Sequence, residues 1–475
     1  MSEFWTETLY ISEWFIRLVM LIVVSRRQNP ASATAWLLII FFEPWLALPV
    51  YWLFGENRLP VRRTKAYRRL SSRLKATRKA FLEHPLTLVS DFPETHRMTM
   101  RLTEKLTNMP IAIGNSAEIL TETDDVIDRL VADIDEAKDH VHLLFYIFAD
   151  DETGRQVAKA LGRAVVRGVK CRVLVDAVGS KRMLRTLASR MREWGVEVQE
   201  ALPVGIFRRR FARMDLRNHR KLAVIDGRLG YTGSQNIVNS DYGHKDLAWH
   251  DMTVRLRGPV LLELQAVFLN DWVFTTNELP EGDDIFPPIE PAGDTPVQTL
   301  PSGPTYQTEN YQRLVVAAIH RAEKGVTITT PYLVPDEALL QALETAVLRG
   351  VEVTVIVPRR CDQILVGAAS RSYFDLLLSK GVEVFLYEPG LLHAKTIRID
   401  DSLSLIGSSN FDIRSFALNF EINIVLYGEV FAAQLRREQE NYLHFANRLT
   451  MAEWRSRPRW RRLGEDVARL FSPLL

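Results

Sequence analysis

Cysteine is almost absent from this sequence, which holds only Cys171 and Cys361 among its 475 residues. A disulfide framework and a cysteine-based zinc cluster are therefore excluded. An excess of either charge is also missing, since 60 Lys and Arg stand against 58 Asp and Glu. That balance argues against a protein that coats DNA. With 47% hydrophobic residues the composition excludes a disordered or fibrous chain, and the length predicts about two to three domains.

The balanced total hides a strongly basic segment. Residues 56–82 contain ten Lys or Arg and a single acidic residue, Glu56, so they carry a charge of +9. Residues 1–55 carry −1, and everything after residue 82 carries −6. A basic segment that follows an apolar N-terminus is attracted to anionic lipid headgroups, by about 1 kcal/mol per charge close to the surface. We therefore predict that residues 56–110 form a basic connector beside a membrane.

The residues before this connector predict membrane-anchoring helices over 1–55. Residues 35–54 form an apolar run with one charge, Glu43, and at 1.5 Å per residue the run spans the ~30 Å hydrocarbon core of a bilayer. Pro44 and Pro49 are expected to kink this helix, which membrane helices tolerate.

An earlier and weaker apolar run covers residues 4–24. It is interrupted by Glu7, Glu13 and Arg17, so it is either a second span or a helix that lies flat at the interface. We favour the span, which makes the N-terminus a transmembrane helical hairpin. The acidic first residues disfavour a cleaved signal peptide, and the basic connector predicts that the rest of the chain faces the cytoplasm.

The rest of the chain contains two similar segments, one beginning at Ile127 and the other at Tyr311. Each follows the order helix, strand, loop, helix, strand, helix, strand. Gly168 and Gly350 stand at matching places where helix C-caps are expected. Continuous apolar strands such as VTVIVP predict strands that are buried on both faces.

These repeats predict two α/β halves of similar fold. We place the first half at residues 111–290 and the second at 291–475, with a basic and aromatic tail at its C-terminal end. Residues 281–304 contain six prolines, and we interpret them as a linker between the halves.

A short motif with chemically active side chains closes each half. Both halves fit the pattern HxKxxxxD, then six residues, then GSxN. Two matches at the same place in two repeats indicate a duplicated site. The members are His219, Lys221, Asp226, Ser234 and Asn236 in the first half, and His393, Lys395, Asp400, Ser408 and Asn410 in the second.

The spacing has a physical interpretation. A His and a Lys two residues apart on a strand point to the same face, and Asp226-Gly227 is a strong signal for a two-residue hairpin turn. Such a turn places His219 opposite Ser234. The second half gives the same pairing, and we predict that the serines and asparagines of the two motifs bind the substrate. The motif aspartate then falls in the turn, where it fixes the hairpin rather than orienting the histidine.

A better carboxylate partner for the histidines lies further along the chain. Asp251 in WHDMTV and Glu421 in NFEINI occupy matching positions in the two halves. A buried carboxylate on one imidazole nitrogen fixes the tautomer and leaves the other nitrogen free to react. We therefore predict that Asp251 and Glu421 orient the two histidines.

Two such patches facing each other gather two His, two Lys and two Asn. This set suits a phosphodiester, because Lys and Asn neutralise the non-bridging oxygens while one His acts as nucleophile and the other as general acid. Carboxylates clustered as in two-metal sites are lacking, so we predict no metal and no other cofactor.

The doubled motif resembles that of the phospholipase D superfamily over about residues 110–450. Nearly the whole chain is similar to bacterial cardiolipin synthases, on the segments RQNPASATAWLL, FYIFADDETG, TPYLVPD and SGP. The resemblance implies two phospholipase D-type halves that share one active site. It also implies transfer of a phosphatidyl group from one phosphatidylglycerol to another, giving cardiolipin and glycerol. His219 is then the nucleophile that forms a phosphatidyl-histidine intermediate, and His393 is the acid and base.

The resemblance further implies a multi-pass protein of the bacterial inner membrane whose catalytic region faces the cytoplasm among anionic lipids. A phospholipase D hydrolase, or a transferase with another acceptor alcohol, uses the same residues and stays an alternative. The membrane segment and the acidic remainder disfavour a nuclease, and we expect no nucleic acid partner. A non-catalytic scaffold is disfavoured because no motif residue is lost.

Two further segments are candidates for contact with lipid. The first half has a longer stretch before its motif, and residues 207–213 in it contain four arginines and two phenylalanines. We interpret them as contacting headgroups beside the site, the alternative being a solvated basic loop. Residues 450–471 mix tryptophan with arginine and are a second candidate for an interfacial segment.

Overall fold

The computed structural model describes residues 2–27, 30–55, 94–203, 215–243, 246–280, 285–288, 290–306, 308–470 and 472. The chain divides into two compact units, an N-terminal group of helices and an α/β body. The basic segment at 56–82 and the arginine-rich stretch at 207–213 lie outside the described residues.

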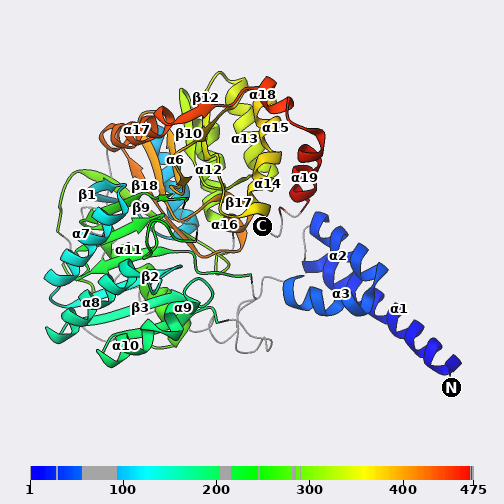
Figure 1. Ribbon diagram of the computed structural model, residues 1–475, viewed down its shortest axis with the longest axis horizontal. Helices are drawn as coiled ribbons and strands as arrows, with labels where there is room; N and C mark the ends of the chain where they lie inside the picture. Colours follow the sequence, from blue (N-terminus) through cyan, green and yellow to red (C-terminus); the bar gives the residue numbers. More distant parts are fainter. Residues whose placement is uncertain are drawn as a thin grey trace. The chain divides into compact units, whose positions relative to one another are not determined.

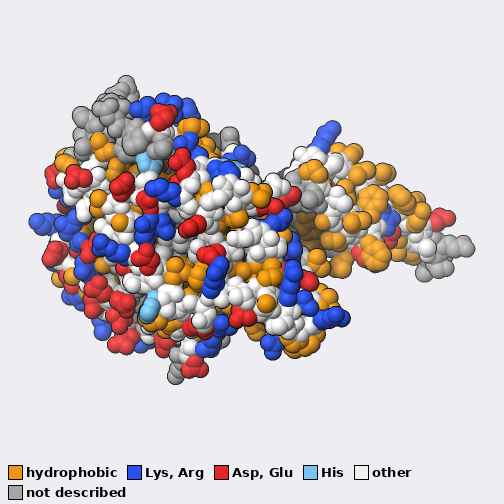
Figure 2. Space-filling view, turned by 90° about the horizontal axis from the view of Figure 1, so that it is seen from above, with side chains coloured by type: hydrophobic (Ala, Val, Ile, Leu, Met, Phe, Trp, Pro, Cys, Tyr) orange, Lys and Arg blue, Asp and Glu red, His pale blue; other side chains and the backbone are white. Residues whose placement is uncertain are grey.

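The N-terminal unit begins with one long apolar helix. Within α1 (Ser2–Arg27), the stretch Phe4–Arg27 is the one candidate for a membrane span that the described residues contain. Two of its charges neutralise each other, because Arg17 Nη2 lies 3.1 Å from Glu13 Oε2 one turn earlier. Figure 2 shows that the helices of this unit present a largely apolar surface. The apolar run at residues 4–24, which looked weaker in the sequence, is therefore the stronger candidate for a membrane span.

The apolar run at residues 35–54 is broken at Glu43 and does not form a single kinked helix. The chain forms α2 (Pro30–Phe42) and α3 (Pro44–Val50), which are separated at Glu43 with φ −135°, and a short π-helix η1 (Tyr51–Gly55) follows. Pro44 disfavours helical geometry in the residue before it, so the helix ends here instead of kinking. α1 and α2 pack together through Val24, Ala33 and Ile40.

The body is built on one sheet of 15 described strands, which runs through both halves (Figure 1). From the centre outward the first half contributes β1 (Ala112–Leu120), β8 (Thr253–Arg257), β6 (Leu229–Gly233), β5 (Lys221–Ile225), β2 (His140–Phe145), β3 (Lys170–Asp176) and β4 (Glu197–Ala201). The second half repeats this order with β9 (Thr295–Ser302), β18 (Glu421–Tyr427), β16 (Leu403–Gly407), β15 (Thr396–Ile399), β10 (Gly325–Thr329), β12 (Glu352–Pro358) and β13 (Glu383–Tyr387), and β19 (Ala446–Arg448) ends the sheet. The prediction of two similar α/β halves is confirmed.

Helices cover both faces of this sheet. One face carries α7 (Thr123–Glu136), α8 (Glu152–Val166), α9 (Lys181–Arg185) and α10 (Leu187–Glu193) in the first half, and α12 (Asn310–Arg321), α13 (Glu337–Leu348), α14 (Ile364–Ser372) and α15 (Phe374–Ser379) in the second. The other face packs on α11 (Val260–Thr276) and α17 (Glu429–His444) through a core that both halves share. Gly168 and Gly350 have φ of +92° and +86° after α8 and α13, as the C-cap prediction requires.

Two predicted boundaries differ from the structure. The proline-rich linker contains strand β9, which pairs with β18 and with β1 where the two halves meet. Pro296 and Pro301 hid this strand, because proline is rare in central strands. Residues 94–107 of the predicted connector form α6 (Glu94–Thr107), and its Met100 is buried in the core of the second half.

Two small sheets complete the framework. β7 (Trp249–His250) of the first half pairs with β14 (Leu391–Leu392) of the second, and β11 (Leu333–Val334) pairs with β17 (Phe411–Asp412). The β7–β14 pair joins the two halves directly before the second motif histidine.

Candidate active site

Each motif lies on a β-hairpin, β5–β6 in the first half and β15–β16 in the second. In the first hairpin Ile225 pairs with Leu229, so the turn has three residues instead of the two that we predicted, and the second hairpin has the same turn. The register is shifted by one residue, and Ser234 is not opposite His219. The first turn residue of both hairpins is an aspartate with φ of +51°.

The motif aspartates hold these hairpins in place. Asp226 accepts hydrogen bonds of 2.9 Å from the backbone N–H groups of residues 138–140, where β2 begins. Asp400 accepts the equivalent bonds from residues 323–325, at 2.7–3.1 Å, where β10 begins. Neither side chain lines the pocket that holds the histidines. Their role is therefore structural, as the turn position indicated, although the motif groups them with the catalytic residues.

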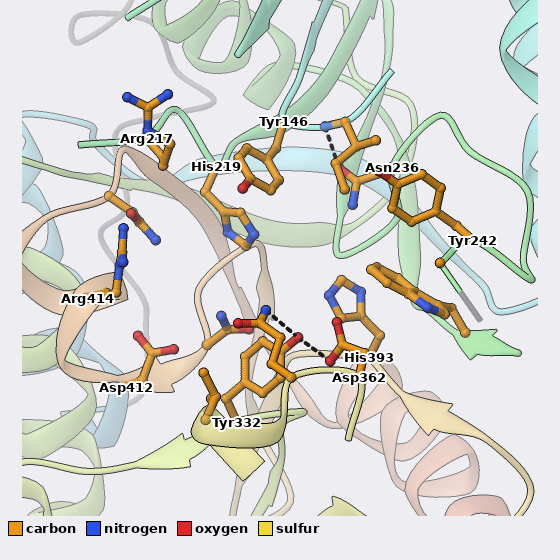
Figure 3. Close-up of a pocket in the computed structure, with 17 residues that line it drawn as sticks. Tyr146, Arg217, His219, Asn236, Tyr242, Tyr332, Asp362, His393, Asp412 and Arg414 are labelled. Atoms are coloured by element: carbon orange, nitrogen blue, oxygen red, sulfur yellow. Dashed lines mark hydrogen bonds between the residues drawn. The ribbon is translucent and has the colours of Figure 1, made fainter. Parts of the chain in front are cut away.

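The two motif histidines line one pocket of about 420 Å³ (Figure 3). His219 lies just before β5, and His393 lies just before β15. Asn236 and Asn410 of the two GSxN motifs line the same pocket. The structure thus brings together the histidines and asparagines of the two halves in a single cavity.

Each histidine is held by a carboxylate from the opposite half. His219 Nδ1 lies 3.0 Å from both carboxylate oxygens of Glu421. His393 Nδ1 lies 2.6 Å from Asp251 Oδ1. A carboxylate only accepts hydrogen bonds, so Nδ1 is the protonated nitrogen in both rings and Nε2 is available in the pocket.

The two halves thus exchange carboxylates, and backbone hydrogen bonds between the halves hold this arrangement. His219 N donates to Phe420 O at 2.9 Å, next to Glu421. His393 N donates to His250 O at 2.8 Å, next to Asp251. Each motif histidine is therefore fixed to the residue before the carboxylate that binds it, and neither half forms a complete site alone.

The two motif serines support the carboxylates and do not line the pocket. Ser408 Oγ donates to Glu421 Oε2, and Ser234 Oγ donates to Asp251 Oδ1 at 2.6 Å. Both serines are fully buried. The prediction that they bind substrate beside the histidine of their own hairpin is wrong. They orient the carboxylate that serves the histidine of the other half.

Burial controls the protonation of these pairs. It lowers the pKa of His219 to about 4, although Glu421 acts in the opposite direction, and it also lowers the pKa of His393. Burial alone raises the pKa of Asp251, but His393 and Lys395 outweigh it and hold that pKa at about 2. The pocket without substrate therefore holds neutral imidazoles on ionised carboxylates at neutral pH.

The motif lysines lie directly behind the histidines. Lys221 Nζ donates to His219 O at 2.7 Å, and Lys395 Nζ donates to His393 O at 2.6 Å. Burial lowers the pKa of Lys395 to about 8 and that of Lys221 well below its usual value. A phosphodiester anion in the pocket would favour the charged form of both lysines.

The sequence did not single out several other residues of the pocket wall. Tyr146 packs edge-on against His219 at 4.9 Å between ring centroids, and Trp249 lies 4.4 Å from His393. Tyr146 directly follows β2 and Tyr332 lies between β10 and β11, and both line the pocket, so the segments FYIFADD and TPYLVPD that contain them were the available signal. Trp249 stands two residues before Asp251, and this closeness in the sequence was the only signal that Trp249 belongs to the site.

The wall is not symmetric. Figure 3 shows Arg217 and Arg414 on the His219 side of the pocket and Tyr242 on the His393 side. Arg217 is buried and pairs through Nη1 with Asp176 at 3.1 Å. Its Nε and Nη2 have no hydrogen-bond partner within the described part of the chain. These donors are suited to an anionic ligand.

Paired HxKxxxxD hairpins that present two histidines to one polar pocket define a phosphodiester-cleaving or phosphodiester-transferring enzyme of the phospholipase D type. The comparisons with known proteins narrow this class. The family description "Cardiolipin synthase, PLD-like domain" matches residues 130–272 and 315–443, and "Phospholipase_D-nuclease N-terminal" matches residues 15–56.

The curated relatives are similar over the whole chain. Cardiolipin synthase A of Proteus mirabilis is 37% identical over 486 residues and covers all of both chains. The protein of the same name from Serratia proteamaculans is 37% identical over 471 residues, 96% of each chain. In fold, the chain is similar to phosphatidylserine synthase of Haemophilus influenzae, with a TM-score of 0.61, 15% identity, and coverage of 80% of this chain and 100% of that one.

The chain belongs to the cardiolipin synthase family of proteins with phospholipase D-like domains. The family match to residues 15–56 and the apolar helix α1 together indicate association with a membrane.

Proposed function

We propose that this protein is a cardiolipin synthase, which transfers the phosphatidyl group of one phosphatidylglycerol to a second and releases glycerol. The observation that carries the proposal is the pair of histidines in one pocket, each held through Nδ1 by a carboxylate of the opposite half. This arrangement leaves two Nε2 atoms available for one phosphorus. The names of the full-length relatives support the choice of lipid.

In the first step, His219 Nε2 attacks phosphorus and the bond from phosphorus to the glycerol oxygen breaks. The low pKa of His219 supports its assignment as nucleophile, because the ring carries a free electron pair at neutral pH. The phosphodiester anion in the pocket favours the imidazolium form of His393, which takes up one proton from solvent before this step, and its Nε2–H then gives that proton to the departing glycerol. Asp251 stays ionised and stabilises the imidazolium form of His393.

In the second step, the hydroxyl of the second phosphatidylglycerol gives its proton to His393 Nε2 and its oxygen attacks phosphorus. The bond between phosphorus and His219 breaks, and cardiolipin leaves. Asn236 and Asn410 line the pocket and donate to the non-bridging oxygens during both steps, and Lys221 and Lys395 stabilise the same negative charge from directly behind the histidines. The unpaired N–H groups of Arg217 support an anionic substrate on the His219 side.

We also propose that the N-terminal unit anchors the protein in the bacterial inner membrane as a multi-pass hairpin. α1 supplies one pass, and α2 with α3 and η1 supplies a broken second pass. The basic connector at residues 56–82 favours a cytoplasmic body among anionic lipids. Labelling of single introduced cysteines in intact cells tests this orientation, and labelling of the body from the outside would contradict it.

Product analysis tests the reaction. Purified protein is added to phosphatidylglycerol vesicles, and we expect cardiolipin and glycerol in equal amounts. Phosphatidic acid as the main product would instead identify a hydrolase. A supply of other alcohols shows whether the acceptor is restricted to phosphatidylglycerol.

A further inference from the structure

The last helix of the chain carries an exposed apolar stripe. In α19 (Arg459–Arg469) and the residue after it, Trp460, Leu463, Val467 and Leu470 are 48–77% exposed. Their spacing places them on one side of the helix. Glu465 and Ala468 occupy the opposite side and are buried against the body. The stripe therefore faces away from the α/β body on which α19 packs.

This stripe is held beside the active site. Buried Glu465 accepts hydrogen bonds of 2.9 Å from Arg371 of α14 and from Arg457, which fixes α19 along α14 (Figure 1). The first turn of α14 forms part of the pocket wall through Gln363 and Val366.

Between these two wall residues lie two exposed apolar side chains. Ile364 is 88% exposed and Leu365 is 47% exposed. Exposed apolar side chains thus lie both at the wall of the active-site pocket and on the helix that packs against α14. We call Ile364, Leu365, Trp460, Leu463, Val467 and Leu470 the apical stripe.

The charge around the stripe suits an anionic partner. Residues 455–469 contain six arginines and two acidic residues, and one of the acids, Glu465, is already paired with two arginines. Trp460 lies under the Arg461 guanidinium at 5.2 Å from the ring centroid. Tryptophan with arginine at the edge of an apolar helix face is typical of helices that lie at a membrane surface.

We propose that the apical stripe inserts into the surface of an anionic lipid bilayer, so that a phospholipid reaches His219 and His393 while its acyl chains stay in the membrane. The pocket accommodates a headgroup because its wall is rich in polar side chains. The acyl chains need an apolar surface next to that pocket. This inference rests on the proposed function, and it adds the route by which the lipid enters.

The test compares two substrate forms in the full-length protein. The variant Trp460→Gln/Leu463→Gln/Leu470→Gln is assayed on phosphatidylglycerol vesicles and on short-chain phosphatidylglycerol kept monomeric. We expect kcat/KM on vesicles to fall by about tenfold and the value on monomers to stay unchanged. An unchanged rate on vesicles, or an equal fall on both substrates, would overturn the proposal.

A matched control removes equally exposed apolar side chains elsewhere. Val166, Leu348 and Val430 are 78–88% exposed on α8, α13 and α17, and their triple change to Gln is expected to leave both rates as they are. Quenching of tryptophan fluorescence by brominated phosphatidylglycerol vesicles gives a direct readout, since Trp460→Phe should remove a quenched component. A stripe that joins two copies of the chain would instead change the mass of the protein in detergent, and that result would contradict a lipid contact.

These outcomes separate the two proposals. Phosphatidic acid as product with a selective fall on vesicles would reject the synthase and keep the lipid-contact surface. Cardiolipin as product with no fall on vesicles would keep the synthase and reject the surface.

Discussion

The His219 and His393 sides of the active site are alike in their chemistry and different in their walls. Each side has a histidine, a buried carboxylate from the other half, a serine on that carboxylate and a lysine behind the histidine. The His219 side adds Arg217 and Arg414, whereas the His393 side adds Tyr242 and Trp249. The duplication thus preserved the proton-transfer groups, and the residues around them diverged.

The two unlike walls are a physical basis for the two roles that we propose for the histidines. Because Glu421 serves His219 and Asp251 serves His393, the halves depend on each other for the tautomer of each ring. The two motifs have the same pattern, so the different residues of the pocket wall distinguish the two imidazoles. Variants on each side should separate these roles, and the largest effects are expected at the histidines themselves.

Replacing either histidine with Asn is expected to lower kcat by on the order of 10⁴-fold, since each Nε2 is needed in both steps. A substrate with an activated leaving group separates the roles. It needs no acid in the first step, so the His393→Asn variant should accumulate a phosphatidyl adduct on His219 that intact-mass analysis detects. An adduct on His393 in the His219→Asn variant would reverse the assignment.

The next largest effects on kcat are expected from the two carboxylates that hold the histidines. Glu421→Gln and Asp251→Asn are each expected to lower kcat by about 10²- to 10⁴-fold, because the imidazole loses the partner that fixes its tautomer. The activated substrate should restore the first step in Asp251→Asn and not in Glu421→Gln, since the exchange assigns Asp251 to the acid and Glu421 to the nucleophile. Measurement of the leaving-group burst checks this, and the opposite rescue pattern would reverse the roles of the two histidines.

Loss of the charge on a motif lysine is expected to have a smaller effect on activity, and this effect depends on pH. Burial lowers the pKa of Lys395 to about 8, so this side chain is cationic below about pH 8 and loses its proton above it. Anionic lipid then binds less well, and kcat/KM should fall as the pH rises through about 8. Lys395→Arg keeps its charge at these values, and the alkaline limb should disappear from its profile. A limb that persists in this variant would assign the titration to another group.

Much of the fold and site could be predicted because it is local and repeated. The α/β order of each half follows from apolar strands and from glycine caps such as Gly168. The histidines and asparagines were found because the motif occurs twice. The carboxylates Asp251 and Glu421 were found for the same reason.

The remainder depends on contacts that no local pattern encodes. The exchange of carboxylates arises from short pairs between the halves, such as β7 with β14, whose two-residue strands have no periodicity. Pro44 divides the apolar run at residues 35–54 into two helices. Pro296 and Pro301 hid strand β9. The prediction of the hairpin register failed because each turn has three residues, although Asp226 and Gly227 both have the positive φ that is typical of a two-residue turn.

The smallest effect on chemistry is expected from the motif aspartates, and here the two halves should behave alike. Asp226→Ala and Asp400→Ala each leave three backbone N–H groups without their acceptor, which costs about 1–3 kcal/mol of folding free energy. Thermal unfolding should therefore begin at a lower temperature. The rate per folded molecule should stay within about twofold of the parent, since neither side chain lines the pocket.

Asp401→Ala is the matched control for this pair. Asp401 is the neighbour of Asp400 in the same turn and forms exposed ion pairs with Lys324, at 3.0 Å, and with Arg436, each of which contributes about 0–1 kcal/mol. Stability close to that of the parent in this variant, with a clear loss in Asp400→Ala, would locate the effect in the three backbone bonds. A fall in rate of tenfold or more in folded Asp226→Ala alone would show that the turns of the two halves have diverged as their walls have, and would return that aspartate to the chemistry of the site.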